Sequence, residues 1–196
     1  MNYLAHAYLS FNDPGLLVGN LISDFVKGKK KYNYPLNILK GIDLHRAIDD
    51  FTDTHPVTRS ARQIFQPAYG LYCGAFMDIA YDYFVANDNP LFAPGTLESF
   101  SEDVYRELNT YVSVFPPRFQ QLFPSMKKHN WLLNYRNHTG IQRSFEGLVY
   151  RAAYMSDSAP AFELFVQNKN ELQSAYDEFF PELIRFTRDI INPKPL

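Results

Sequence analysis

Cysteine, glycine and net charge are all scarce in this chain of 196 residues. The single cysteine, Cys73, cannot form an internal disulfide, which fits a reducing cytoplasm better than a secreted protein. The formal net charge of −2 excludes a general attraction to nucleic acid or anionic lipid. No apolar run approaches the roughly 18 residues of a membrane span, and the N-terminus lacks the features of a signal peptide. We therefore expect a cytoplasmic protein that binds neither nucleic acid nor membrane.

Apolar and aromatic side chains are abundant. They make up 46% of the residues, with 17 Phe and 14 Tyr, which indicates a packed interior. Strand-like alternation bounded by hairpin turns is missing, whereas helical periodicity is widespread. No repeat or long linker divides the chain. The sequence thus predicts an all-α fold, a multi-helix bundle that forms one domain over residues 1–196.

Prolines mark most of the expected helix boundaries. Asp13 and Pro14 have the character of an N-cap followed by proline at the first helical position. We predict helices over residues 3–10, 14–26, 35–54, 56–65, 69–86, 97–115, 126–136, 140–151 and 160–191, with a short one around Phe119. The last helix is expected to break near Pro181, and residues 27–34 and 87–94 are expected to be loops.

Two aspartates stand out in the apolar helix predicted over residues 69–86. Asp78 and Asp82 are four residues apart and therefore share a helical face. No lysine or arginine lies in this helix to compensate them. Burying a carboxylate costs roughly several kcal/mol per ion unless a cation is present. This favours a metal ion or an arginine from another helix over the alternative of a solvated polar stripe.

A second polar face follows in the helix predicted over residues 35–54. His45, Asp49 and Asp53 recur every four residues. Imidazole and carboxylate one turn apart suit Mn²⁺ or a similar divalent ion. The alternative is a salt-bridged surface helix in which Arg46 and Arg59 are the partners.

A third pair, Asn20 and Asp24, has the same spacing, and His6 stands among apolar residues near the start of the chain. Each of these features alone has an ordinary structural explanation. Taken together, they place polar pairs on several helices, which is how helical bundles build metal sites. Such a site suits phosphoryl chemistry, because a divalent ion polarises a phosphoryl oxygen and lowers the pKa of bound water.

A basic run directly follows Asp24. A run of this kind is most often a solvated loop, but beside the expected site it would neutralise phosphate or attract an acidic protein. The basic residues and the amide expected to contact substrate or partner are Asn20, Lys27, Lys29, Lys30, Arg59 and Arg136.

Several blocks of sequence carry a family resemblance. They are Met1-Asn2-Tyr3-Leu4-Ala5-His6, Gly19-Asn20-Leu21, Asp24-Phe25-Val26-Lys27-Gly28, His45-Arg46, Ile48-Asp49, Phe51-Thr52-Asp53, Asp78-Ile79-Ala80-Tyr81-Asp82-Tyr83-Phe84, Trp131-Leu132 and Tyr135-Arg136. In this order they resemble acyl carrier protein phosphodiesterase, also called holo-acyl-carrier-protein hydrolase. One departure is Tyr83, where the family block often has histidine.

The resemblance implies an all-α fold distantly akin to HD-domain phosphohydrolases. It implies Mn²⁺-dependent removal of 4′-phosphopantetheine from holo-acyl carrier protein, an activity connected with fatty acid biosynthesis. It points to Asp24 as a residue needed for activity. We accordingly expect Mn²⁺ or Mg²⁺ to be bound by His45, Asp49, Asp78, Asp82 and Asp24, with Asp24, His6 and Arg46 as catalytic residues.

Two other functions stay open on the sequence alone. One is a metal-dependent phosphohydrolase acting on a nucleotide or another small phosphodiester. The other is a non-catalytic helical module that binds an acidic carrier protein.

Overall fold

The computed structural model describes residues 1–152, 155 and 157–193. Within these residues the chain forms α-helices and short 3-10 helices and has no β-strand. The predicted all-α class is therefore confirmed. Among the described residues, none of the helices combines the length and the apolar character that crossing a membrane requires.

The first three helices carry most of the polar pairs noted in the sequence. They are α1 (Tyr3–Tyr8), α2 (Pro14–Ile22) and α3 (Leu36–Thr54). The predicted basic loop contains a 3-10 helix, Gly28–Asn33, and a further short 3-10 turn, Ser23–Phe25, ends α2 earlier than the sequence suggested.

Two glycines allow α2 and α3 to pack with their backbones nearly in contact. A Cβ atom added to Gly19 would lie 2.1 Å from the carbonyl oxygen of Ile38, and one added to Gly41 would lie 2.4 Å from that of Leu16. Both distances are far below van der Waals contact, so only glycine fits at these positions. This close approach places the end of α2, with Asn20, beside the middle of α3, with His45.

The predicted N-cap of α2 is confirmed, and it yields a stability prediction. The Asp13 side chain accepts a hydrogen bond from the backbone N–H of Leu16 at 2.8 Å, and Pro14 follows at the first helical position. We expect Asp13→Ala to lower the free energy of unfolding by about 1 kcal/mol, because one helix N–H loses its partner. Urea denaturation would measure it, and Asp13→Asn should keep most of the stability because its side-chain oxygen can still cap the helix.

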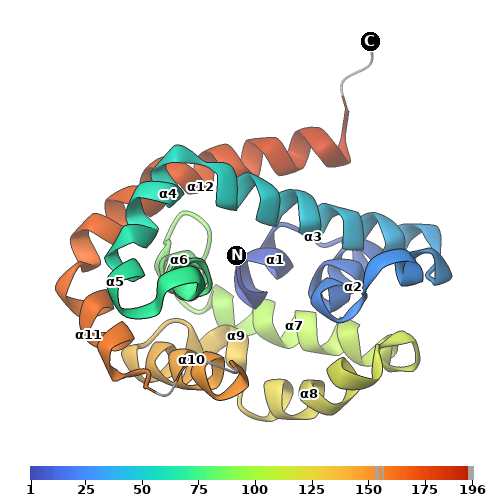
Figure 1. Ribbon diagram of the computed structural model, residues 1–196. Helices are drawn as coiled ribbons and strands as arrows, with labels where there is room; N and C mark the ends of the chain where they lie inside the picture. The colour runs from blue at the N-terminus through green and yellow to red at the C-terminus, as the bar shows by residue number, and fades with distance from the viewer. Residues whose placement is uncertain (153–154, 156, 194–196) are drawn as a thin grey trace.

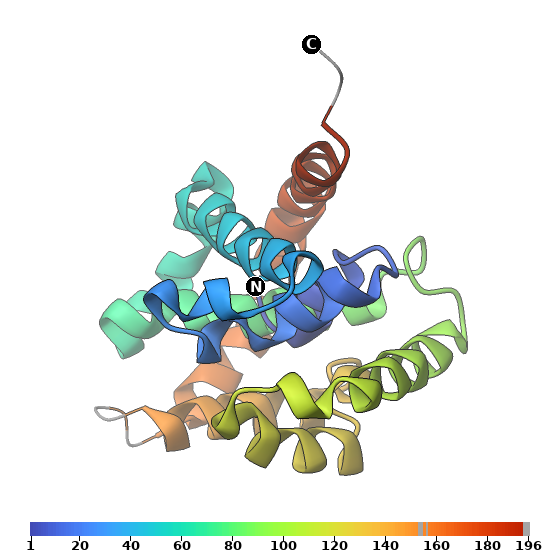
Figure 2. The ribbon, with the colours of Figure 1, turned by 90° about the vertical axis from the view of Figure 1, so that its right-hand side faces the viewer.

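The middle of the chain contains a buried helix. It consists of α4 (Pro56–Ala61), α5 (Gln66–Tyr69), α6 (Cys73–Asn87) and α7 (Thr96–Thr110). Helix α6 is buried along most of its length and contacts α1, α10 and α12. Figure 1 shows α1 and α6 inside a ring of helices, with α3 and α12 along one side and α10 and α8 along the other. The same arrangement, turned by 90°, is visible in Figure 2.

The C-terminal helices differ from prediction at two prolines. The elements are α8 (Pro117–Lys128), α9 (Trp131–Asn134), α10 (His138–Arg151), α11 (Ala159–Gln167) and α12 (Lys169–Ile191). Helix α8 continues through Pro124 and α12 continues through Pro181, so the break expected near Pro181 is instead at Asn168. Both prolines are exposed, and the carbonyl group that each leaves without an N–H partner can be hydrated.

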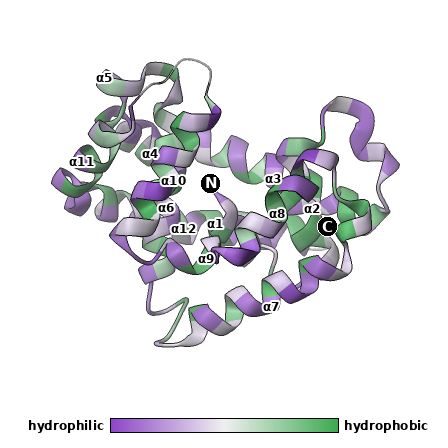
Figure 3. Cartoon of the chain, turned by 90° about the horizontal axis from the view of Figure 1, so that it is seen from below, coloured by the Kyte–Doolittle hydropathy of each residue, from purple (hydrophilic) through white to green (hydrophobic). Residues whose placement is uncertain are grey.

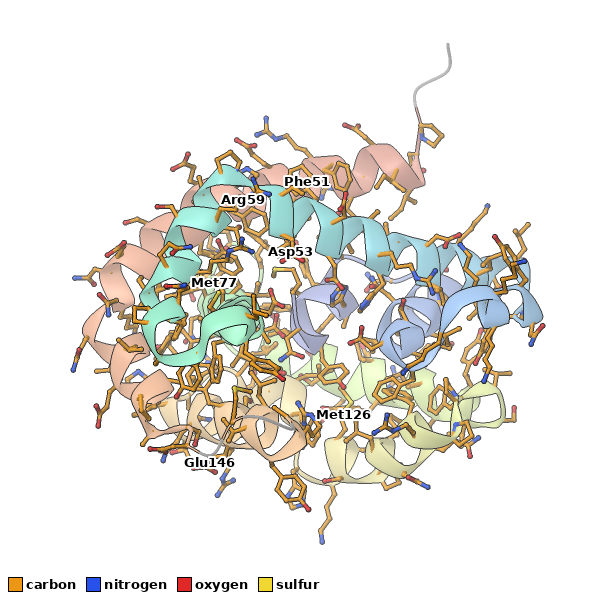
Figure 4. The ribbon with its side chains drawn as sticks, viewed as in Figure 1. Phe51, Asp53, Arg59, Met77, Met126 and Glu146 are labelled. Atoms are coloured by element: carbon orange, nitrogen blue, oxygen red, sulfur yellow. The ribbon has the colours of Figure 1, made fainter. Side chains whose placement is uncertain are left out.

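Aromatic packing joins the outer helices to the interior. Phe51, labelled in Figure 4, stacks on Phe186 of α12 with ring centroids 4.4 Å apart. Met77 of α6 and Met126 of α8, also labelled there, are fully buried. Figure 3 shows hydrophilic and hydrophobic bands alternating along α7, as expected for a helix with one face on the core.

Candidate functional site

Two histidines from different helices form the centre of the candidate site. His6 of α1 and His45 of α3 are both buried. Their rings stack with centroids 4.0 Å apart and an interplanar angle of 16°. Stacking two imidazoles this closely is unfavourable if both are charged. At most one of the two rings is therefore the protonated imidazolium.

Asn20 of α2 determines how both rings are oriented. Its Nδ2 donates to the carbonyl of His6 at 2.9 Å and to the hydroxyl of Ser10 at 3.2 Å, which leaves Oδ1 as an acceptor for Nδ1 of His6 at 2.7 Å. The backbone carbonyl of Asn20 accepts from Nδ1 of His45, also at 2.7 Å. Since Nδ1 is the donor in both rings, Nε2 of each ring can present a lone pair. Asn20 is thus buried beneath the histidines, in place of the substrate contact expected from the sequence.

Two carboxylates complete the cluster. Oδ1 of Asp49 lies 3.2 Å from Nε2 of His6, and its Oδ2 lies 3.0 Å from Nε2 of His45. Asp24 lies on the outer side, 3.1 Å from Nε2 of His45, and its side chain is 69% exposed. His6, His45 and Asp49 have ligand atoms that all lie within 4.8 Å of one another, a spacing that one metal ion can bridge.

The pKa shifts of the two histidines run in opposite directions, so one ring favours the charged form and the other the neutral form. Burial, and to a smaller extent the neighbouring His45, lower the pKa of His6 to about 4. Burial also disfavours charge on His45, but hydrogen bonds with Asp24 and Asp49 outweigh it and raise the pKa of His45 to about 9. Despite its burial, Asp49 has a pKa held well below its usual range by the N-terminal ammonium group and the two histidines. The hydrogen bond with His45 likewise lowers the pKa of Asp24.

The Asp78/Asp82 pair serves the N-terminus of the chain. Both oxygens of Asp82 accept backbone N–H groups at the start of α1: Leu4 at 2.7 Å, Ala5 at 3.2 Å and Asn2 at 3.3 Å. Oδ1 of Asp78 lies 3.0 Å from the ammonium group of Met1, which also lies 3.4 Å from Asp49. In place of the metal ion or arginine expected from the sequence, Asp78 faces an ammonium group and Asp82 faces the N–H groups at the start of a helix. Neither Asp78 nor Asp82 belongs to the histidine cluster in the described structure.

The predicted basic residues lie at three separate places. Lys27, Lys29 and Lys30 are exposed just beyond Asp24, and Arg46 donates to the carbonyl of Val26 at 3.0 Å. Arg59 donates to the backbone of Asp53, and Arg136 pairs with Glu98 at 3.0 Å. Only the lysine segment and Arg46 are thus grouped beside the histidine cluster.

Tyr83, the departure from the family pattern, points away from the cluster. Its hydroxyl accepts a hydrogen bond from Lys169 of α12 at 2.7 Å, and its ring packs against Phe165 and His138. None of these partners belongs to the histidine cluster. The tyrosine at this position therefore contributes to packing among α6, α11 and α12, and it is not one of the side chains of the histidine cluster.

The sequence did not reveal two features of the site. One is that Asn20 orients both histidines, for which the only signal was its spacing from Asp24. The other is a cavity beside α1, about 460 Å³ in volume, to which α10 contributes Arg143 and Arg151. The signal for it was a helical stripe of glycine and arginine in residues 140–151.

Comparison with known proteins shows which family this chain matches. Residues 1–183 match the family described as acyl carrier protein phosphodiesterase. A protein of this name from Photorhabdus laumondii is 29% identical over 94% of this chain and 93% of its own length. Proteins of the same name from Yersinia pestis and Serratia proteamaculans are 30% and 28% identical, over 94% and 96% of this chain and 96% and 98% of their own lengths. No solved structure matches the chain.

Proposed function

Because the chain belongs to the acyl carrier protein phosphodiesterase family, we propose that it is a phosphoric diester hydrolase that converts holo-acyl carrier protein to the apo protein and 4′-phosphopantetheine. The observation that supports this best is the convergence of the Nε2 atoms of two imidazoles and a carboxylate within 4.8 Å of one another. The names of the curated relatives supply the substrate.

The proposed metal site consists of His6, His45 and Asp49, with Asp24 beside them. Nε2 of His6 is buried and has no hydrogen-bond partner among the described residues, although Asp49 is near. A buried polar atom without a partner is costly, and a metal ion would satisfy it. Imidazole together with carboxylate suits Mn²⁺, with Mg²⁺ as the alternative. His6, which the sequence predicted to be a catalytic residue of this site, is thereby proposed as a metal ligand.

The proposed reaction forms one bond and breaks one. The oxygen of a water molecule bonds to phosphorus and gives up a proton to solvent. The ester bond to the serine oxygen of the carrier protein breaks, and that oxygen takes a proton from solvent. A divalent ion supplies polarisation of the phosphoryl oxygen and a lower pKa of water. Asp24 is exposed and its pKa is lowered, so at neutral pH its ionised carboxylate can accept a hydrogen bond from the attacking water and orient it.

The lysine segment and Arg46 are proposed to receive the carrier protein. Lys27, Lys29 and Lys30 are exposed on the side of the site where Asp24 opens to solvent. Arg46 holds this segment through its bond to the carbonyl of Val26. Positive charge here speeds the encounter with an acidic protein, and this contribution falls with ionic strength.

Mass spectrometry of the carrier protein tests the proposal. Holo-acyl carrier protein incubated with the enzyme and Mn²⁺ is expected to lose the mass of the phosphopantetheine group, and a chelator should stop the loss. An unchanged carrier mass with Mn²⁺ and with Mg²⁺ would overturn the proposed activity. Cleavage that continues in chelator would overturn the metal requirement alone.

A further inference from the structure

A cavity of about 460 Å³ lies beside the N-terminus of α1, between α9 and α10. Its size is in the range of pockets that hold small molecules. In Figure 3 the N-terminus lies near the centre of the view, with α10 on one side and α9 below it. None of the cavity residues belongs to the histidine cluster, so the cavity is a separate feature of the molecule.

Tyr3 connects the cavity to the histidine cluster. It lines the cavity, and it lies three residues before His6, so the two side chains are neighbours on the same face of α1. Burial raises the pKa of the Tyr3 hydroxyl to about 12, while the Arg151 guanidinium lowers it and the Asp24 carboxylate raises it. One turn of α1, from Tyr3 to His6, therefore links the cavity to the histidine cluster.

Helix α10 supplies the polar wall of the cavity. Gly140, Arg143, Ser144, Gly147 and Arg151 all line it, at spacings that place them along one helical face. Gly147 lies between the two arginines along this face, and a Cβ atom there would be in ordinary van der Waals contact with a terminal nitrogen of Arg151, at 3.4 Å. Neither arginine forms an ion pair within the described part of the chain, so their guanidinium groups have donors to offer to a ligand.

Aromatic rings supply the opposite wall. Trp131 of α9 lies against Tyr3, with ring centroids 6.1 Å apart and an interplanar angle of 54°. Both rings line the cavity, as does Tyr135. Arginine donors facing aromatic surfaces suit a flexible chain that carries amide carbonyls along an aliphatic backbone.

On these grounds we propose that the cavity binds the pantetheine arm of the substrate. This inference rests on the proposed function: with the phosphodiester at the histidine cluster, the arm runs past Tyr3 and enters the cavity. Its amide carbonyls accept hydrogen bonds from Arg143 and Arg151, and its methyl and methylene groups lie on Trp131 and Tyr3. The cavity thus distinguishes an acylated or free pantetheine ester from smaller phosphodiesters.

Trp131 makes the test direct, because it is the only tryptophan in the chain. Pantetheine, which lacks phosphate, is titrated into the protein while tryptophan fluorescence is followed. We expect a saturable change, and we expect Arg143→Ala, Arg151→Ala and the cavity-filling Gly147→Leu each to weaken it. Each arginine variant should also lower kcat/KM for holo-acyl carrier protein by about tenfold, as the loss of a hydrogen bond from a charged donor predicts. Arg118→Ala, an exposed arginine on α8, is the matched control and should bind pantetheine as the unaltered protein does.

Three results would overturn the inference. The first is no fluorescence change with pantetheine in a protein that cleaves holo-acyl carrier protein, an outcome that leaves the proposed function intact. The second is full kcat/KM in the folded Gly147→Leu variant. The third is a change in tryptophan fluorescence when apo-acyl carrier protein is added but not when pantetheine is added. That result would assign the cavity to a side chain of the carrier protein. Failure of the proposed function itself would be visible separately, as an unchanged carrier mass.

Discussion

Replacing Asp49 by asparagine is expected to lower kcat/KM for holo-acyl carrier protein by on the order of 10³-fold, because loss of a metal ligand removes several kcal/mol of transition-state stabilisation. The two oxygens of Asp49 face Nε2 of His6 and Nε2 of His45, at 3.2 and 3.0 Å. Asparagine keeps the shape but has one oxygen, no charge, and an amide that directs N–H donors at a ring nitrogen. Steady-state kinetics and calorimetric titration with Mn²⁺ would measure both losses.

Asp50→Asn is the matched control for this variant. Asp50 is the adjacent carboxylate on α3, is exposed, and lies outside the histidine cluster. Its substitution should leave kcat/KM and Mn²⁺ affinity unchanged. If Asp49→Asn bound Mn²⁺ and cleaved the carrier as well as Asp50→Asn does, Asp49 would not be a ligand. Stabilisation of the folded protein by Mn²⁺ in a thermal melt is a second readout, and it should be present in Asp50→Asn and missing in Asp49→Asn.

The second large effect concerns stability. Asp82→Ala is expected to lower the free energy of unfolding by about 3 kcal/mol, because buried N–H groups of Asn2, Leu4 and Ala5 lose their acceptor at a cost of about 1–3 kcal/mol for an unsatisfied group. The loss of the buried charge offsets part of this cost, since burial raises the pKa of Asp82 to about 7. In a protein of this size the midpoint of thermal unfolding should fall by about 6–12 °C.

Asp82→Asn separates this anchoring role from the metal-binding role expected from the sequence. The asparagine side-chain oxygen can still accept from the start of α1, so this variant should lose less stability than Asp82→Ala and keep its affinity for Mn²⁺. An unchanged melting midpoint in Asp82→Ala, together with loss of Mn²⁺ binding in Asp82→Asn, would instead support a ligand role for Asp82. Asp88, at the end of the same helix, is not a suitable control position for these substitutions. Its carboxylate accepts a hydrogen bond from Tyr176, and replacing it would change that contact as well.

Local sequence signals predicted the helices well where their physical cause is local. The Asp13 cap and the long helix after Pro35 depend on backbone geometry within a few residues, and both are present. The break expected near Pro181 was predicted wrongly for the opposite reason. A helix tolerates a proline more readily where the carbonyl that the proline leaves unpaired can reach water, and exposure is a tertiary property.

The candidate site shows the same division. The spacing of His45 and Asp49 on one face of α3 is a property of the helix, so the sequence alone determined that these two side chains lie together. The electrostatic anomaly of Asp78 and Asp82 was also visible there, and so was the need for a cation. Which cation compensates them depends on packing, and the packing of α1 against α6 supplies the ammonium group of Met1 and a helix N-terminus.

The sequence by itself therefore determined the all-α class, the helix that carries His45 and Asp49, and the family of the chain. Only the tertiary structure decided that His6 faces His45, that Asn20 orients both rings, and that Arg143 and Arg151 line a cavity together with Tyr3. The physical reason is that residues three or four apart on a helix meet through local geometry, whereas side chains from different helices meet only where the helices pack. Here that packing depends on Gly19 and Gly41, which allow α2 and α3 to approach closely enough to bring Asn20 beneath the two histidines.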